Sequence, residues 1–168
     1  SENYEIGAKF DLFGNRVRLN TAAYYTDATN VQFTQSIPSP TGQGAVTSIA
    51  TNQGAGEIYG LEFDLAAAIT EALTMTAGYS YVHTEVTKGC DDFKYTLNTG
   101  GLIYAPALGH GKECSVVGKR YPLGSEEQAF LAFNYDSPMA MGNGLNLIGN
   151  FATSYESSKY VQLYNLAE

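Results

Sequence analysis

Two cysteines are the residues of this 168-residue chain best suited to covalent chemistry. Cys90 and Cys114 are its only cysteines, and 23 residues separate them within a long stretch rich in Gly, Lys and Asp. A disulfide between them would constrain that stretch and stabilise the fold by roughly 3 kcal/mol on a loop-entropy estimate. An oxidising, extracellular setting favours such a bond. Two free thiols are the alternative, and thiol labelling with and without reductant distinguishes the two states.

Aromatic and cationic side chains gather in the same stretch, which runs from about residue 87 to residue 125. Rings beside cations can hold an anionic, ring-bearing ligand by stacking and charge. The residues predicted to contact such a ligand are Phe93, Tyr95, Tyr104, His110, Arg120 and Tyr121, with Lys112 and Lys119 beside them. The competing interpretation is that these side chains pack the stretch against itself or cover neighbouring loops. A metal site is disfavoured, because neither cysteine has a second ligand at short spacing and one histidine is insufficient.

Motifs for enzymatic chemistry are missing from the sequence. It contains no Gly-x-Ser-x-Gly, no phosphate-binding Gly-Lys loop and no His-Glu-x-x-His, and it has only two histidines. The paired carboxylates Asp91–Asp92 and Glu126–Glu127 are interpreted as solvated charge. The net charge of -8, with nine scattered Lys and Arg residues, argues against nucleic-acid binding. We therefore expect neither an enzyme nor a nucleic-acid-binding protein, and we expect no cofactor.

Alternation of residue types defines the elements that must position these side chains. In the runs Glu57–Leu65 and Leu73–Tyr81, apolar or aromatic residues alternate with polar or small ones. Successive side chains of a strand point to opposite faces, so each run predicts a strand with one apolar and one polar face. The pattern recurs along the chain and predicts an all-β, antiparallel fold of about six to eight strands. Six strands are well defined, and a seventh is expected to begin at Lys159.

The predicted connections alternate between short and long. They are short at residues 13–16, 70–72 and 137–144, and long at about 35–48 and 87–125. In an up-and-down meander alternate connections lie at the same end, so the short ones share one end and the long ones the other. Short periplasmic turns and long extracellular loops are typical of outer-membrane barrels. The strands also reach the roughly 9 to 11 residues needed to cross a bilayer at a tilt. Residues 52–56 suggest a bend or bulge.

Consecutive strands of the chain resemble the later part of a TonB-dependent receptor barrel. The resemblance is carried by NYEIGAKF (3–10), LFGNRVRLNTAAYY (12–25) and EIYGLEFDL (57–65), and by their spacing to 73–81. It implies an outer-membrane barrel of about 22 strands that encloses an N-terminal plug. It further implies import of a scarce nutrient such as an iron–siderophore complex, in the bacterial outer membrane. The implied partners are membrane lipid, the rest of the barrel and the plug, TonB acting through the plug, and the nutrient ligand.

The chain departs from that family in having no plug-like region and no closing terminal strand. We therefore expect residues 1–168 to form part of a larger barrel. The alternative function is a non-transporting outer-membrane barrel or surface binding protein that uses its long loops. A soluble lipocalin-like barrel is a third interpretation, and it requires the apolar face to point inward.

The two faces of the strands carry specific expectations. Tyr59, Leu61, Phe63 and Leu65 are predicted to face lipid. The residues predicted to face the lumen are Glu5, Lys9, Arg18, Asn20, Gly60, Glu62 and Asp64. Phe130 is an exception, because it falls on the polar side of its strand. His83, at the outer end of its strand, is expected to be an interface or lumen residue with no further role.

Overall fold

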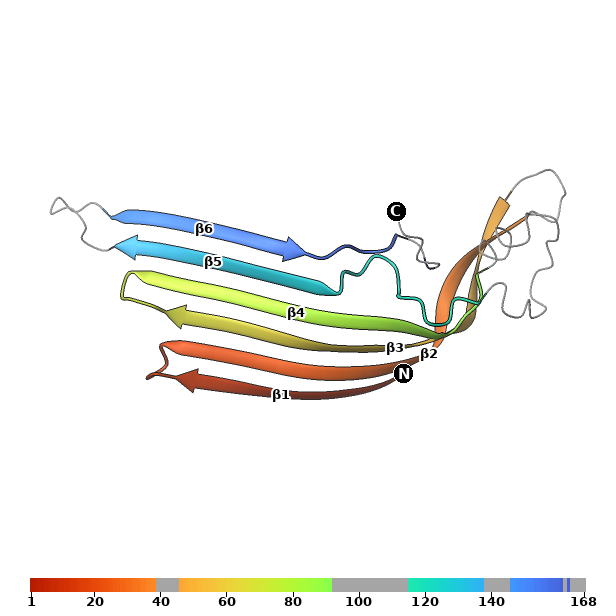
Figure 1. Ribbon diagram of the computed structural model, residues 1–168, viewed down its shortest axis with the longest axis horizontal. Coiled ribbons are helices and arrows are strands. Elements are labelled where there is room, and N and C mark those ends of the chain that lie inside the picture. The colour runs from red at the N-terminus through yellow and green to blue at the C-terminus, as the bar shows by residue number, and fades with distance from the viewer. Residues whose placement is uncertain (39–45, 92–114, 138–145, 162, 164–168) are drawn as a thin grey trace.

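The computed structural model describes residues 1–38, 46–91, 115–137, 146–161 and 163. Its strands are β1 (Glu2–Leu12), β2 (Val17–Pro38), β3 (Val46–Ala68), β4 (Leu73–Lys88), β5 (Glu127–Ser137) and β6 (Leu147–Glu156). Each strand pairs antiparallel with its neighbour in sequence, in the order β1-β2-β3-β4-β5-β6 (Figure 1). This arrangement confirms the all-β, up-and-down prediction. No described helix has the length and apolar character needed to span a membrane.

The register of the sheet separates apolar from polar rows. Leu61 on β3 lies opposite Ala23 on β2 and Tyr81 on β4. The next residue, Glu62, lies opposite Ala22 and Ser80. Directly opposed residues share one face of a sheet, so the alternation within each strand becomes continuous apolar and polar rows across strands.

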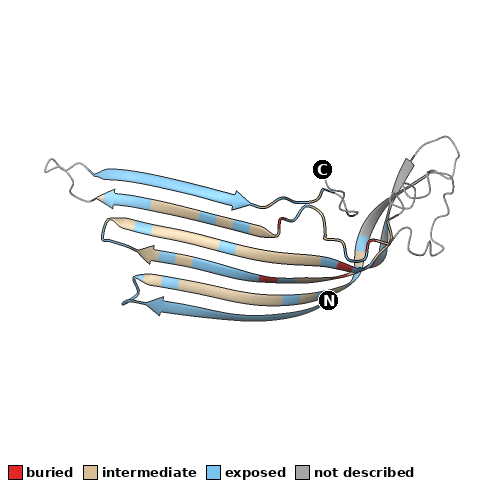
Figure 2. Cartoon of the chain, in the orientation of Figure 1, coloured by how far each residue is buried: buried red, intermediate tan, exposed pale blue. Residues whose placement is uncertain are grey.

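The sheet is a single layer whose apolar face is uncovered. Tyr59, Leu61 and Phe63 are 42%, 44% and 41% exposed to solvent. Among the described hydrophobic residues only Val86 and Val116 are fully buried. Figure 2 accordingly shows exposed and intermediate residues along almost the whole length of the strands. An apolar face of this extent requires an apolar partner, which is the role that lipid plays for a barrel.

The β1–β2 and β3–β4 turns are short and lie at one end of the sheet, as predicted (Figure 1), whereas the predicted connection at 137–144 lies outside the described residues after Ser137. The β1–β2 turn uses positive φ angles at Phe13, Gly14 and Asn15, of which Gly and Asn tolerate this conformation best. The turn is tied to the β3–β4 turn, because Arg16 Nη2 donates to the Ile69 carbonyl oxygen at 3.0 Å. β2 and β4 end at the opposite end of the sheet (Figure 1). We call that end the mouth.

The predicted loop over about 35–48 is shorter than expected. β2 continues to Pro38 and β3 begins at Val46, with pairs such as Gln35↔Ile49 and Ser36↔Ser48 in register. Backbone hydrogen bonds hold this part of the hairpin, and they do not depend on alternating side-chain polarity. The expected irregularity near 52–56 is confirmed by register shifts opposite it, around Val31. The end of this hairpin bends away from the sheet beyond that point (Figure 1).

The prediction of a seventh strand from Lys159 is wrong for the described residues 159–161, which form no strand. Residues 162, 164 and 165 of that prediction lie outside the described residues. The backbone of this segment has a different partner, because the Leu123 amide donates to the Tyr160 carbonyl oxygen at 2.8 Å. The described residues 157–161 after β6 are therefore held to the connection that precedes β5 and do not extend the ladder.

Candidate functional site: lumen wall and mouth

The polar face of β3 to β6 forms an open groove of about 460 Å³. Two adjoining register rows line it, namely Glu62, Ser80, Gln128 and Glu156, and Asp64, Gly78, Phe130 and Ser154. These two rows contribute carboxylates, hydroxyls, an amide and the Phe130 ring, and Tyr79 and Tyr155 also border the groove. In a closed barrel this polar wall faces the lumen, where it can meet a hydrated interior, an enclosed domain or a passing ligand.

Phe130 lies on this polar face because of the glycine opposite it. Gly78 on β4 is its register partner, and a Cβ placed on Gly78 would overlap the Phe130 ring. The ring therefore covers the bare backbone of the neighbouring strand, as an aromatic residue does when it compensates a glycine. This contact explains the exception in the alternation of β5. Tyr24 covers Gly60 in the same way.

A second hollow, of about 440 Å³, lies beside the first on β1 to β3. It is lined by predicted lumen residues, including Glu5, Lys9, Asn20, Glu62 and Asp64. Arg18 lies closer to the short turns, and its Nε donates to Asp11 Oδ1 at 2.9 Å. Both of these side chains are exposed, so the pair contributes little to stability.

At the mouth, residues 115–126 fold back onto the end of β4. The Val86 amide donates to the Lys119 carbonyl oxygen at 2.8 Å, and the Gly118 amide donates to the Val86 carbonyl oxygen at 2.9 Å. Val86 and Val116 form a small buried core, against which Val31, Tyr121 and Leu163 pack. Burial raises the pKa of the Tyr121 hydroxyl above its ordinary value.

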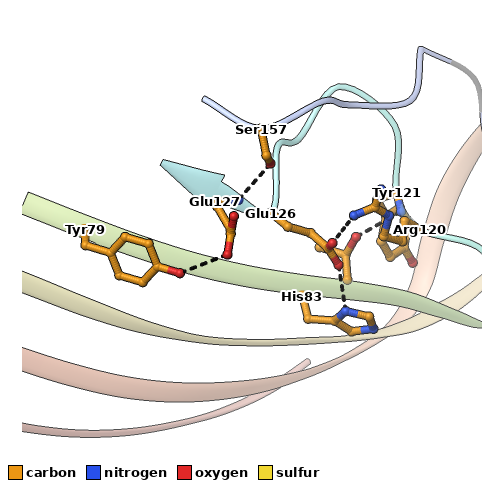
Figure 3. Close-up of polar contacts among 8 residues, drawn as sticks. Tyr79, His83, Arg120, Tyr121, Glu126, Glu127 and Ser157 are labelled. Carbon is orange, nitrogen blue, oxygen red and sulfur yellow. Dashed lines mark hydrogen bonds and ion pairs between the residues drawn. The ribbon is translucent and has the colours of Figure 1, made fainter. Parts of the chain in front are cut away.

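Glu126 is the centre of a polar cluster at the mouth (Figure 3). Its Oε1 lies 2.9 Å from His83 Nδ1 on β4, and its Oε2 forms an ion pair with Arg120. The Arg120 guanidinium lies 4.7 Å from the centre of the Tyr160 ring, after β6. The His83 ring stacks on Tyr59 of β3 at 4.9 Å. This role of His83 is not predicted by the sequence, in which the only signal for it is the position of His83 near a strand end.

Glu127 has different partners although it is adjacent in sequence. Its Oε1 accepts a hydrogen bond from the Tyr79 hydroxyl at 3.2 Å, and its amide donates to Ser157 Oγ at 3.0 Å (Figure 3). The interpretation of Glu126–Glu127 as solvated charge is therefore wrong. Strand pairing brings β4 and the chain after β6 next to these carboxylates, which sequence spacing does not reveal.

The described candidates for ligand contact have structural partners. Arg120 binds Glu126, and the Tyr121 amide donates to Thr84 Oγ1 at 3.0 Å. The candidates Phe93, Tyr95, Tyr104 and His110 lie outside the described residues, as does Lys112.

The predicted disulfide is described at one cysteine only. Cys90 forms an antiparallel bridge with Ser115, the residue that follows Cys114. The bridge places Ser115 beside Cys90, and Ser115 directly follows Cys114 in the sequence. This position supports a disulfide bond between the two cysteines. Cys114 lies outside the described residues, and the disulfide stays a prediction.

A comparison with protein families decides what kind of barrel this is. The family model for the β-barrel of TonB-dependent receptor-like proteins matches residues 1–167. The chain belongs to the TonB-dependent receptor family. A probable TonB-dependent siderophore receptor, PiuA of Acinetobacter baumannii, is 31% identical to it over 104 residues. This match covers 62% of the chain but only 13% of that relative. The predicted family is thereby confirmed, and TonB-dependent receptors are transporters rather than enzymes.

Proposed function

We propose that the chain is part of an outer-membrane receptor that imports an iron–siderophore complex. The family match over residues 1–167 carries this proposal, and the similarity to a siderophore receptor supports the choice of nutrient. The two unlike faces of the sheet suit the task. The apolar face meets outer-membrane lipid, and the polar wall with Glu62, Asp64 and Gln128 faces the lumen, the plug and the passing nutrient.

In this proposal the mouth faces the outside of the cell. The connection between β4 and β5 then meets the ligand first, and the candidates for ligand contact are those named from the sequence within residues 87–125. A disulfide between Cys90 and Cys114 constrains this connection covalently in an oxidising compartment. TonB acts on the plug of the parent receptor and reaches these residues only indirectly.

Uptake of radioactive iron tests the proposal. Cells that lack the parent gene are grown under iron limitation and supplied with iron bound to a hydroxamate or a catecholate siderophore. We expect uptake of at least one complex to be lost with the gene, to return with the full-length gene and to require TonB. A receptor that is assembled in the outer membrane but takes up neither complex contradicts the proposed nutrient and favours a surface binding protein.

A further inference from the structure

Two segments of the chain pack against each other at the mouth, and we call them the collar. The segments are residues 115–126, before β5, and residues 157–161, after β6. A backbone hydrogen bond from Leu123 to Tyr160 joins them directly. A second connection runs through side chains, because Arg120 of the first segment lies over the Tyr160 ring of the second.

One carboxylate adds side-chain contacts to the backbone hydrogen bonds and the buried valines that hold residues 115–126 on the barrel wall. Glu126 holds Arg120 through one oxygen and His83 of β4 through the other, and His83 in turn stacks on Tyr59 of β3. The cluster thus runs from Tyr59 of β3 to Tyr160 after β6. Figure 3 shows its centre, where Glu126 lies between His83 and Arg120. The side chains of Glu126, His83 and Arg120 are only 29%, 24% and 24% exposed, so solvent screens the ion pairs less than at an open surface.

We propose that Glu126 is a positioning residue for ligand capture at the mouth. It does not touch the ligand. It holds the foot of the β4–β5 connection and the segment after β6 in one fixed arrangement, so that ligand binding does not have to order them. Pre-organisation of this kind raises affinity by removing an entropic cost of binding. The inference rests on the proposed function, because it assumes a ligand at this end of the barrel.

The adjacent carboxylate provides a matched control. Glu127 lies in the same region, and its side chain accepts a hydrogen bond from Tyr79 of the neighbouring strand. E126Q and E127Q each remove one charge and preserve size. E126D keeps the charge on a shorter side chain and serves as the conservative variant.

The test measures iron uptake by the full-length receptor against the concentration of the iron–siderophore complex that the wild type imports. We expect E126Q to raise the half-saturating concentration about tenfold, because charge-assisted hydrogen bonds are among the strongest in proteins. The maximal rate should change less than about twofold. E127Q should match the wild type, and E126D should recover part of the loss. A purely structural role of Glu126 would reduce the amount of assembled barrel and so lower the maximal uptake rate, and this outcome would overturn the proposal. An equal rise of the half-saturating concentration in E126Q and E127Q would overturn it as well.

A second measurement does not depend on transport. Trypsin is added to intact cells, and cleavage after Lys119 within the collar is followed by mass spectrometry. We expect cleavage to be about tenfold faster in E126Q than in E127Q, since loss of the ion pairs lets this segment open more often although its backbone hydrogen bonds to Val86 remain. A wild type that imports no iron refutes the proposed function. In that case equal cleavage in the two variants also refutes the claim that Glu126 holds the collar in place. Faster cleavage in E126Q than in E127Q supports that claim.

Discussion

At the scale of single residues, glycines on the polar face decide where aromatic rings lie. Gly56, Gly60 and Gly78 are covered by Tyr121, Tyr24 and Phe130, respectively, and a Cβ at any of them would overlap the ring or hydroxyl above it. Each of these aromatic side chains therefore lies against the backbone of the neighbouring strand. This arrangement buries part of a large aromatic side chain over the glycine.

Gly78→Ala should destabilise the barrel, because the new methyl group overlaps the Phe130 ring. We expect a loss of about 1–3 kcal/mol in the free energy of unfolding, the usual cost of overpacking. Urea unfolding of the full-length receptor in detergent measures it. Gly149→Ala on β6 is the control, since the nearest heavy atom to its Cβ is 4.0 Å away. Equal stability of the two variants would contradict the packing described for Phe130.

The face assignment of β3 makes a second prediction at this scale. Leu61→Arg puts a charge on the apolar face, and Glu62→Arg puts the same charge on the polar face. We expect the first to cost about 2–4 kcal/mol near the bilayer midplane and to reduce assembly, and the second to be tolerated. Gel mobility of the unheated and heated receptor reports the assembled fraction. Equal tolerance at the two positions would mean that the face assignment is wrong.

At the scale of elements, the connection between β4 and β5 is anchored at both ends. Cys90 bridges to Ser115 at its start, and residues 115–126 pack around Val86 and Val116 before β5 begins. The anchoring explains how a connection of this length joins two adjacent, paired strands. Arg120 and Tyr121 serve this anchoring, because their contacts are with Glu126, with β3 and β4, and with Tyr160 after β6.

The disulfide is a prediction at the same scale. Without reductant, we expect neither Cys90 nor Cys114 to react with a maleimide in the unfolded receptor, and with reductant we expect both to react. The double variant C90S/C114S should lose roughly 3 kcal/mol of stability or less, because the packed foot of the connection remains. Full labelling without reductant would exclude the bond.

At the scale of the whole molecule, a single-layer sheet cannot stand alone. β1 and β6 are exposed along their entire length, and each has only one neighbouring strand among the described residues. Open edges of this length, combined with an apolar face, promote association with other chains. The fold described here is therefore complete only within a larger barrel.

Residues 1–168 produced alone should not form a soluble monomer. We expect aggregation in water, because the apolar face and both sheet edges have no partner. Size-exclusion chromatography with and without detergent measures this. A detergent-free monomer with a cooperative unfolding transition would favour the lipocalin-like interpretation, in which the apolar face points inward.

The sequence alone determined the elements and their two faces. A period of two residues is a local property, so runs such as 57–65 and 73–81 predict strands without knowledge of their partners. The alternation of short and long connections predicts which strand ends lie together. The motifs at 3–10, 12–25 and 57–65 were sufficient to suggest the family that the comparison confirms.

Only the tertiary structure decided which distant residues meet. Glu126 and His83 are 43 positions apart, and no pattern near either residue specifies the contact. The same holds for Phe130 above Gly78, for the paired end of the β2–β3 hairpin, and for the segment after β6 that packs on the mouth. The physical reason is that these contacts are set by the register between strands and by the path of the chain between and after them. They depend on the free energy of the whole sheet rather than on the alternation within one strand.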